Sequence, residues 1–445
     1  MRVILITLLL LASTQARAAT VHFGFGQAKA NIAAAFVGAN NGDDFIAHGP
    51  LTENNQAVTW ALLNCTLTVV GGDYVFDGTG ATLDGIKITG TGNTFDFLGA
   101  DGSQMSFTGY GRFVFWVSAA SNTVNDPYVY DNGYAVAGNC YNFMLYANST
   151  YNRPVLASAL DNNARHYGMY INASGGGAVN DLSIANVVVT GGASRFYGVQ
   201  SLGACGAVVV DGVTISNCSA AGVSWGMYWA GTGAGDVMQA RRVHIDSVTS
   251  AGTTQVMYAA QVAMDLQNFV IENCDGDAIY IASTTGFAGG THQIANGVIY
   301  GAGDDGVYAN SDVAGSQLTV RNVIARNCTG IGFSSASTFD PDSDNNLAYS
   351  NGTDWNSWIA GADDLTVDPQ HVDAAGGDYH LFVDSPCIDA GAWITGRTTD
   401  IDGNPMSGPE MDIGPYEFQQ QSGRTIRMQV TSPVRVPTRN VRSAR

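Results

Sequence analysis

Short apolar runs, separated by Gly, Asn and Asp, recur along the chain at nearly constant intervals. One register repeats a small residue, an apolar residue and usually a Tyr, and its apolar members lie 22–30 residues apart at Met169, Val199, Met227, Met257, Ile279 and Val307. A second register advances by 25–30 residues through Val187, Val213, Val243, Phe269, Val298 and Val323. Runs of this length are too short for a pair of helices and are typical of strands.

Two registers that advance together predict a solenoid, in which each strand pairs in parallel with its equivalent in the next coil. We therefore expect an all-β chain whose parallel β-helix spans residues 61–338. Asn is favoured at the corners of such coils because it tolerates the left-handed backbone conformation. A cap over residues 19–60, with a short helix within 27–39, is expected to cover the first coil, since an open sheet edge needs protection.

Three of the seven cysteines follow an Asn in equivalent positions of the repeat. Cys218, Cys274 and Cys328 are 56 and 54 residues apart, which corresponds to two coils. Two coils separate the sulfurs by roughly 9–10 Å, whereas a disulfide needs Cα atoms within about 7 Å. We expect these three cysteines to be buried and free.

The two ends of the chain differ from its body. Residues 1–18 read as a secretory signal peptide, with an apolar run from 3 to 11 and a small-x-small cleavage pattern that ends at Ala18. The sequence thus predicts export from the cytoplasm, to the periplasm or the exterior, and no transmembrane segment in the mature chain. Residues 423–445 contain six Arg and no acidic residue, which is typical of a disordered basic tail.

Charge and composition narrow the function classes. Residues 19–423 hold 11 basic and 38 acidic residues, and hence a net charge of −27, although the whole chain has −19. Binding to nucleic acid needs a basic surface, so an acidic body makes a nucleic-acid partner unlikely. The scarcity of Glu and Lys beside abundant Asp and Gly also argues against a mainly helical protein.

The C-terminal part of the body carries a series of ordered motifs. They read DP, GDYHL, SPCIDAG, TDIDGNP and DIGPYEF at 368–369, 377–381, 385–391, 399–405 and 412–418. This series resembles the C-terminal region of secreted bacterial right-handed β-helix proteins of the choice-of-anchor Q type, which implies an irregular capping region over 339–422. The repeats resemble the wider pectin-lyase-like superfamily. These resemblances imply a right-handed β-helix and export. They do not indicate which activity the protein has, because one fold supports many functions.

A row of Tyr follows the first register. If the apolar residues of that register point inward, strand alternation directs the next residue outward in every coil. The row contains Tyr170, Tyr228, Tyr258, Tyr280 and Tyr308, with Gln200 in one coil. Aromatic surfaces bind the apolar faces of sugar rings, so the row is a candidate polysaccharide-binding surface. It is equally compatible with a Tyr ladder that only stabilises the sheet.

Acidic residues at one end of the same strands are candidates for hydrolysis. Asp277 and Asp305 should align on adjacent coils, with Asp304 beside them and Asp275 close by. Clustered carboxylates raise one another's pKa and can supply an acid beside a base. The segment 303–310 (GDDGVYAN) resembles the Gly-Asp-Asp strand of polygalacturonase-type glycosidases, but the later Gly-His-Gly and Arg-Ile-Lys motifs of that family are absent.

The other end of these strands is a candidate for β-elimination. Arg165 and Arg195 should be neighbours on adjacent coils and could hold a uronate carboxylate. His166 or Tyr167 could take or donate the proton. An acidic body disfavours a polyanionic substrate unless a cation bridges the charges, so the sequence places hydrolysis slightly ahead of lyase chemistry.

An acidic loop near the end of the repeats is a candidate Ca²⁺ site. Asp340, Asp342 and Asp344 alternate as in a Ca²⁺-binding loop, although the Gly and Glu of an EF-hand are missing, and turn formation explains the same pattern. The sequence therefore predicts an exported β-helix protein that binds or degrades polysaccharide. The alternatives are a glycoside hydrolase, a uronate lyase and a non-catalytic adhesin or matrix protein.

Overall fold

The computed structural model describes most of the chain between residues 19 and 419. The described ranges are 19–54, 57–78, 84–132, 139–161, 165–173, 175–191, 194–203, 207–231, 237–260, 262–283, 292–310, 318–336, 342–358 and 360–419. The predicted signal peptide and basic tail lie outside them. The described residues contain no helix that is long and apolar enough to cross a membrane.

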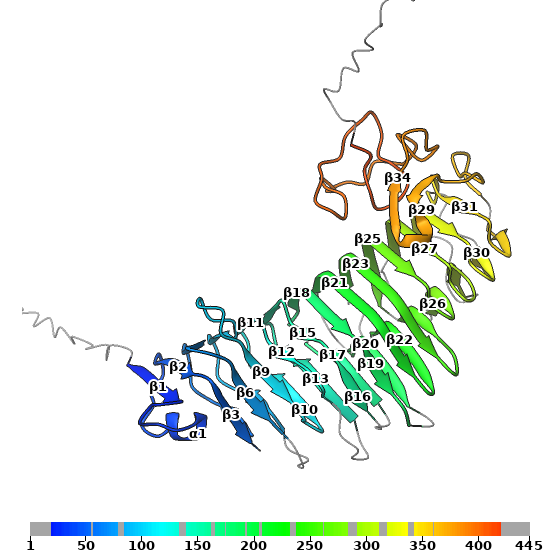
Figure 1. Ribbon diagram of the computed structural model, residues 1–445. Helices are drawn as coiled ribbons and strands as arrows, with labels where there is room; N and C mark the ends of the chain where they lie inside the picture. The colour runs from blue at the N-terminus through cyan, green and yellow to red at the C-terminus, as the bar shows by residue number, and fades with distance from the viewer. Residues whose placement is uncertain are drawn as a thin grey trace, which may run out of the picture.

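The chain winds into an elongated parallel β-helix with two long sheets (Figure 1). Sheet B has 12 strands: β4 (Val58–Trp60), β7 (Ile86–Ile88), β10 (Phe113–Val117), β13 (Asn139–Leu145), β17 (Arg165–Ile171), β20 (Arg195–Leu202), β22 (Val223–Ala230), β24 (Gln255–Ala260), β26 (Asp277–Ser283), β28 (Val307–Ala309), β30 (Ile331–Ser335) and β32 (Thr353–Asn356). Each of its strands pairs in parallel with the next, as the repeat predicts.

Sheet A has 20 strands and folds around the rest of each coil. They are β1 (Thr20–Gly24), β2 (Asp44–His48), β3 (Leu51–Asn54), β5 (Thr66–Val70), β6 (Tyr74–Asp77), β8 (Thr94–Asp96), β9 (Met105–Thr108), β11 (Thr123–Asn125), β12 (Tyr128–Val129), β14 (Thr150–Asn152), β15 (Val155–Leu156), β16 (Ala159–Asp161), β18 (Gly177–Ala185), β19 (Val187–Val189), β21 (Ala207–Ala220), β23 (Val237–Ser250), β25 (Ala263–Glu272), β27 (His292–Tyr300), β29 (Leu318–Arg326) and β31 (Leu347–Tyr349).

Two columns of left-handed residues bend sheet A. The non-glycine members of the first column have φ between 50° and 59°, and they are Asp126, Arg153, Asp181, Arg242, Asn268, Asn296, Asn322 and Asn345. The second column passes through Asn186, Asn217, Ser247, Asn273, Asn327 and Ser350. Asn makes up half of the non-glycine residues in the first column and two thirds of those in the second, since its short side chain tolerates this conformation. The predicted corner chemistry is therefore confirmed.

The first register is confirmed and the second needs correction. Met169, Val199, Met227, Met257, Ile279 and Val307 are aligned on successive coils, and all are fully buried. In sheet A, Val213, Val243 and Phe269 align, but Phe269 pairs with Gly297 rather than Val298. Val187 belongs to a different strand, β19, which lies beyond the next corner. An apolar pattern alone could not resolve this, because two corners lie only five residues apart along the coil.

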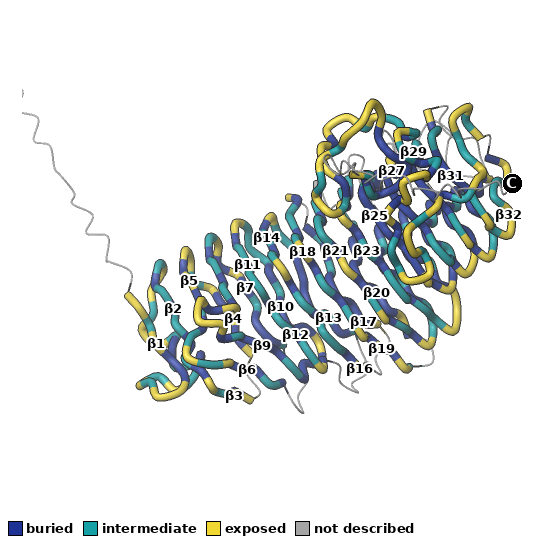
Figure 2. The backbone as a smooth tube through the Cα atoms, turned by 45° about the horizontal axis from the view of Figure 1, so that its top comes forward, coloured by how far each residue is buried: buried dark blue, intermediate teal, exposed yellow. Residues whose placement is uncertain are grey.

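The core is continuous along the solenoid, with buried and partly exposed positions alternating along the strands (Figure 2). Cys218, Cys274 and Cys328 lie in it, in free form, and burial raises the pKa of each thiol to about 12. The prediction of buried, unpaired cysteines is confirmed.

Both predicted boundaries of the β-helix move outward. Parallel pairing already begins with β1 and β2, and it continues to β32 at Asn356. The predicted helix is one short turn, α1 (Ile32–Ala35), with Asn31 as its N-cap, and it buries Ile32 and Ala35 against the first coils. The N-terminal segment is thus part of the coil system as well as its cap.

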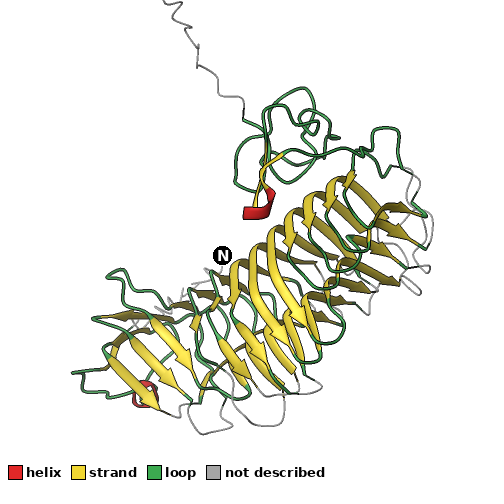
Figure 3. Cartoon of the chain, turned by 45° about the vertical axis from the view of Figure 1, so that its right-hand side comes forward, coloured by secondary structure: helices red, strands yellow, loops and turns green. Residues whose placement is uncertain are grey.

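The C-terminal region packs on the outer side of sheet A, beside the last coils (Figure 3). It contains the 3-10 turn η2 (Ala374–Gly376) and the antiparallel pair β33 (His371–Asp373) and β34 (Asp378–Leu381). An apolar cluster joins the two parts, with Val270, Val298, Ile324 and Leu347 from sheet A facing Tyr379, Leu381, Cys387 and Ile413. Val298 therefore points outward into this contact, which explains its departure from the inward register.

Candidate functional site

The outward face of sheet B carries the predicted Tyr row. We define the Tyr column as Tyr228, Tyr258, Tyr280 and Tyr308. Their rings stack with centroid distances of 4.7, 5.7 and 5.0 Å and interplanar angles below 25°. Each ring lies on a neighbouring coil because the strands pair in register.

A second column lies beside the first, three residues earlier in each strand. Tyr141, Tyr167, Tyr197 and Trp225 stack along it with centroid distances of 4.4, 4.9 and 4.7 Å. The indole Nε1 of Trp225 donates a hydrogen bond to Gln255 Oε1 at 3.3 Å, and the same column continues into Asp277 and Asp305. One line of residues therefore changes from aromatic to acidic along the solenoid.

The acidic end of this line forms a compact group. We call Asp277, Asp304 and Asp305 the carboxylate cluster, because one oxygen from each lies within 4.8 Å of the others. Asp305 is only 8% exposed, Asp277 is half-buried and Asp304 is exposed. The sequence predicted this juxtaposition, and the register of β26 and β28 produces it.

Main-chain amides hold the two less exposed carboxylates. Asp277 Oδ1 accepts from the N–H of Asp305 at 3.2 Å, and Asp305 Oδ1 accepts from the N–H of Ile331 at 2.8 Å. Each carboxylate is thus held by the coil that follows it. Asp275, which the sequence placed near the group, instead accepts from the N–H of Ser250 at 2.7 Å and lies outside the cluster.

A glycine on the next coil leaves room for the cluster. A Cβ atom at Gly330 would lie 2.6 Å from Asp305 Oδ1 and 2.7 Å from Asp304 Oδ1. Any side chain there would have to displace both carboxylates. Sequence inspection missed Gly330, although its position after Thr329 in the coil beyond Asp304 and Asp305 was a usable signal.

Two carboxylates of the cluster have a pKa above the ordinary value of aspartate. Burial, together with the charges of Asp304 and Asp305, raises the pKa of Asp277 to about 6, although the hydrogen bond from Asp305 N–H lowers it. Burial also raises the pKa of Asp305, with a further contribution from Asp304. The group therefore favours either a proton or a cation in its midst.

The spacing of the oxygens fits one Ca²⁺ ion and argues against an inverting glycosidase pair. Oxygens bound to one Ca²⁺ at 2.3–2.6 Å lie at most about 5 Å apart, which the 4.8 Å limit satisfies. The carboxyl groups of glycosidases are separated by about 5–5.5 Å in retaining enzymes and 6.5–9.5 Å in inverting ones. Three protein carboxylates would leave further positions for water or for oxygens of a ligand.

The alternative lyase residues are only partly brought together. Arg165 and Arg195 are register neighbours, and both are exposed. His166 is fully buried, and its Nε2 lies 2.9 Å from Asn142 Nδ2, so its ring does not reach the outward face that the two arginines share. Arg195 lies three coils from Asp277, or about 14 Å.

Tyr170 belongs to the same outward position, but Gln200 separates it from the Tyr column. Its ring makes edge contacts with Tyr141 and Tyr167 at centroid distances of 5.3 and 5.7 Å, and a tilted contact with Tyr146. Gln200 itself is buried. The predicted row is thus continuous over four coils rather than six.

The predicted Ca²⁺ loop is described only in part, because Asp340 lies outside the described residues. Asp342 faces Arg321, with 3.4 Å between Oδ2 and Nη2. Asp344 Oδ1 accepts from the N–H groups of Asn345 and Asp363 at 2.8 and 3.0 Å, which is turn chemistry. Calcium binding at this loop stays a prediction.

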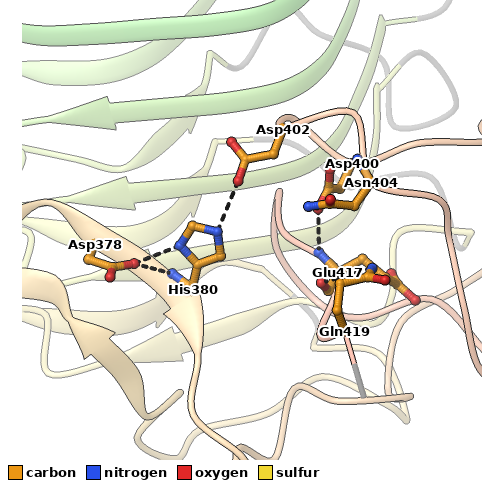
Figure 4. A network of polar contacts seen from close by, with 7 residues as sticks. All are labelled: Asp378, His380, Asp400, Asp402, Asn404, Glu417 and Gln419. Atoms are coloured by element: carbon orange, nitrogen blue, oxygen red, sulfur yellow. Dashed lines mark hydrogen bonds and ion pairs between the residues drawn. The ribbon is translucent and has the colours of Figure 1, made fainter. Parts of the chain in front are cut away.

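The C-terminal region adds a polar network that the sequence did not reveal (Figure 4). His380 lies between two carboxylates, with Nδ1 2.7 Å from Asp378 Oδ1 and Nε2 3.0 Å from Asp402 Oδ2. The ring also contacts Tyr416 at a centroid distance of 4.1 Å. Burial opposes protonation, but the two carboxylates prevail and raise the pKa of His380. Asp378 belongs to the same motif as His380, whereas Asp402 belongs to another, so spacing in the sequence gave no signal for the pair of carboxylates.

No protein-family model and no curated protein matches this chain. Among solved structures, the chain is similar to the pectate lyase Pel9A, with 13% identity and a TM-score of 0.39 over 91% of this chain and 96% of that chain. It is also similar to a PL6 family polysaccharide lyase from Pseudopedobacter saltans, with 11% identity and a TM-score of 0.46 over 82% of this chain and 96% of that chain. The assignment of a parallel β-helix rests on the strand pairing of this chain itself.

Proposed function

We propose that the protein is an exported enzyme that binds an acidic polysaccharide along the outward face of sheet B and cleaves it by β-elimination. The observation that carries the proposal is the continuity of the Tyr column with the carboxylate cluster. Asp277 and Asp305 act electrostatically on Tyr308, the last ring of the column. Sugar rings stacked on the column would thus lead directly to the cluster.

A Ca²⁺ ion held by Asp277, Asp304 and Asp305 would neutralise the acidic surface and polarise a uronate carboxylate, which makes the neighbouring C–H more acidic. With the ion bound, the cluster would orient the substrate carboxylate. Tyr228, Tyr258 and Tyr280 line the path of the sugar rings. Tyr308 is the candidate proton donor to the departing glycosidic oxygen, because burial, Tyr280 and the two carboxylates raise its pKa and keep its hydroxyl protonated. The proton of the substrate C–H passes to water, which then restores the proton of Tyr308.

Hydrolysis, which the sequence slightly favoured, receives less support from the geometry. The oxygens of the three carboxylates lie within the range that one Ca²⁺ ion spans, and well below the separation of about 6.5–9.5 Å in inverting glycosidases. A non-catalytic binding protein is the second candidate, because Asp277 and Asp305 each accept a main-chain hydrogen bond and the stacked Tyr rings stabilise sheet B by themselves.

The deciding experiment incubates the purified protein with polygalacturonate, alginate and a neutral glucan, with Ca²⁺ or with a chelator. Elimination produces new reducing ends together with the ultraviolet absorbance of an unsaturated uronate, whereas hydrolysis produces reducing ends alone. We expect both signals on an acidic polymer, and a loss of about a hundredfold or more with a chelator or in Asp277→Asn. Binding without either signal would assign the protein to the non-catalytic class.

Two further variants make the test specific. Gly330→Ala retains all three carboxylates but fills the space beside two of them, and we expect it to reduce cleavage strongly. Asp246→Asn is the matched control. This partly exposed carboxylate lies in sheet A, where it accepts hydrogen bonds from Ser247 and Asn273. If Asp246→Asn and Asp277→Asn lose activity equally, the cluster is not the site.

A further inference from the structure

The second feature that calls for a ligand is a buried arginine on the opposite side of the solenoid. Arg397 is 8% exposed, and none of its three guanidinium nitrogens has a hydrogen-bond partner. A buried guanidinium without a partner is costly, since each N–H loses its bond to water. Arginine is otherwise found buried with carboxylates or phosphates that its planar donor group fits.

The neighbouring acids do not fill this role. Asp400 accepts from Asn404 and from the N–H of Glu417, as Figure 4 shows, and Glu417 accepts from the N–H groups of Ser407 and Asp412. Asp265 Oδ1 accepts from Gln267 Nε2 at 2.6 Å. These three acids lie close enough to act on the charge of Arg397, but each bonds to other donors.

Arg397 opens onto a cavity of about 190 Å³ between the segment 396–399 and sheet A. The other lining residues that matter here are Asp211, Arg241, Arg242, Gln267 and Asn268. Asp211 is paired with Arg242, with 2.7 Å between Oδ1 and Nε, so Arg241 and Arg397 are the cations of the lining that an anionic group can reach.

An unpaired acceptor lies beside the unpaired donors. Asn268 donates through Nδ2 to the carbonyl oxygen of Thr399 at 3.3 Å, which directs its Oδ1 away, and this buried oxygen has no partner. A ligand that carries an oxyanion and a hydroxyl group would bind both: the oxyanion would accept from the guanidinium of Arg397, and the hydroxyl would donate to Asn268 Oδ1. The cavity shares Gln267 with a second cavity of about 240 Å³, which Trp393 borders with a half-exposed indole held by a hydrogen bond to Pro409.

We propose that the Arg397 cavity binds the oxyanionic group of a small ligand, a carboxylate or a sulfate, with a sugar acid as the best fit. The carboxylate lies on the guanidinium of Arg397 and near Arg241. A sugar hydroxyl donates to Asn268 Oδ1, and the ring extends past Gln267 toward Trp393. This site lies on sheet A and does not depend on the function proposed for sheet B.

Isothermal titration calorimetry at constant ionic strength tests the site with three probes: sodium galacturonate, galactose and sodium sulfate. We expect galacturonate to bind, galactose to bind at least about tenfold more weakly, and Arg397→Met to lose about tenfold to a hundredfold in galacturonate affinity. If sulfate binds as tightly as galacturonate and Arg397→Met loses this binding too, the ligand of the cavity is a free oxyanion and not a sugar acid. Affinity that is unchanged in Arg397→Met would overturn the proposal.

Two variants guard against loss of structure. Arg241→Gln changes an exposed side chain of the same cavity and should weaken binding severalfold, whereas Arg153→Gln, an exposed arginine paired with Asp126 on a distant coil, should leave it unchanged. In anion-free buffer Arg397→Met should unfold at a higher temperature than the parent, because it removes an unpaired buried charge. Asp277→Asn should retain galacturonate binding here, so failure of this site and failure of the sheet B site remain distinguishable.

Discussion

The outward faces of sheets A and B use the same coils in different ways. On sheet B each coil adds one ring or one carboxylate in register, and the face stays open. On sheet A, from β21 to β31, a non-repeating C-terminal region covers the outer positions and creates cavities between coil and cap. Repetition thus builds an extended surface, whereas departure from the repeat builds enclosed sites with unpaired polar groups.

The largest test of this contrast concerns the contact between the C-terminal region and sheet A. Ile413→Ala removes a fully buried side chain from that contact and should lower the free energy of unfolding by about 2–5 kcal/mol, measured by urea titration. Polysaccharide cleavage should persist, because sheet B does not contact Ile413. Val367→Ala, at a partly exposed site, is the control with little expected change. If Ile413→Ala also abolished cleavage under conditions where the protein stays folded, the outer face of sheet A and the face of sheet B would not function independently.

A second test uses the proton that competes for the carboxylate cluster. Because the pKa of Asp277 is raised to about 6, Ca²⁺ must displace a proton below that pH. Calcium affinity should fall by up to about tenfold per pH unit below pH 6 and level off above pH 7. Calorimetry from pH 5 to 8 measures it, with Asp277→Asn as the reference. A flat profile would remove Asp277 from the cation site.

A smaller effect is expected in the Tyr column. Tyr258→Ala interrupts the stack between two neighbouring rings and should weaken polysaccharide binding by about 0.5–1.5 kcal/mol, while Tyr258→Phe retains most of it. Affinity electrophoresis compares the variants on one polymer. A change of unfolding free energy without any change in binding would reduce the column to a structural ladder.

The smallest effect belongs to His380. Its pKa is raised in the fold, so its contribution to stability is fully present below the ordinary value near 6.5 and is lost as pH rises through the raised value. The parent should exceed His380→Gln in unfolding free energy at pH 5.5 by a few tenths of a kcal/mol, since the side chain is half exposed. The difference should shrink as the pH rises through the raised pKa of His380 and disappear once the ring is neutral in both states. An increase with pH would contradict the ion pairs with Asp378 and Asp402.

Sequence alone predicted what repetition encodes. The alignment of Asp277 with Asp305, the stacked Tyr residues and the free cysteines all follow from one coil length, because parallel pairing converts spacing into distance. The sequence could not predict features that depend on packing between the coils and the C-terminal region. The outward turn of Val298 and the unpartnered guanidinium of Arg397 arise from contacts between the coils and a C-terminal region that does not repeat.

The free cysteines can report the order in which coils of the solenoid unfold. Cys218, Cys274 and Cys328 occur on every second coil, and a thiol with a pKa of about 12 is almost entirely protonated at neutral pH and therefore unreactive. A coil that unfolds exposes an ordinary thiol, which reacts rapidly with an alkylating reagent. The order in which the three become labelled would trace the path of opening along the molecule, coil by coil, without any engineered probe.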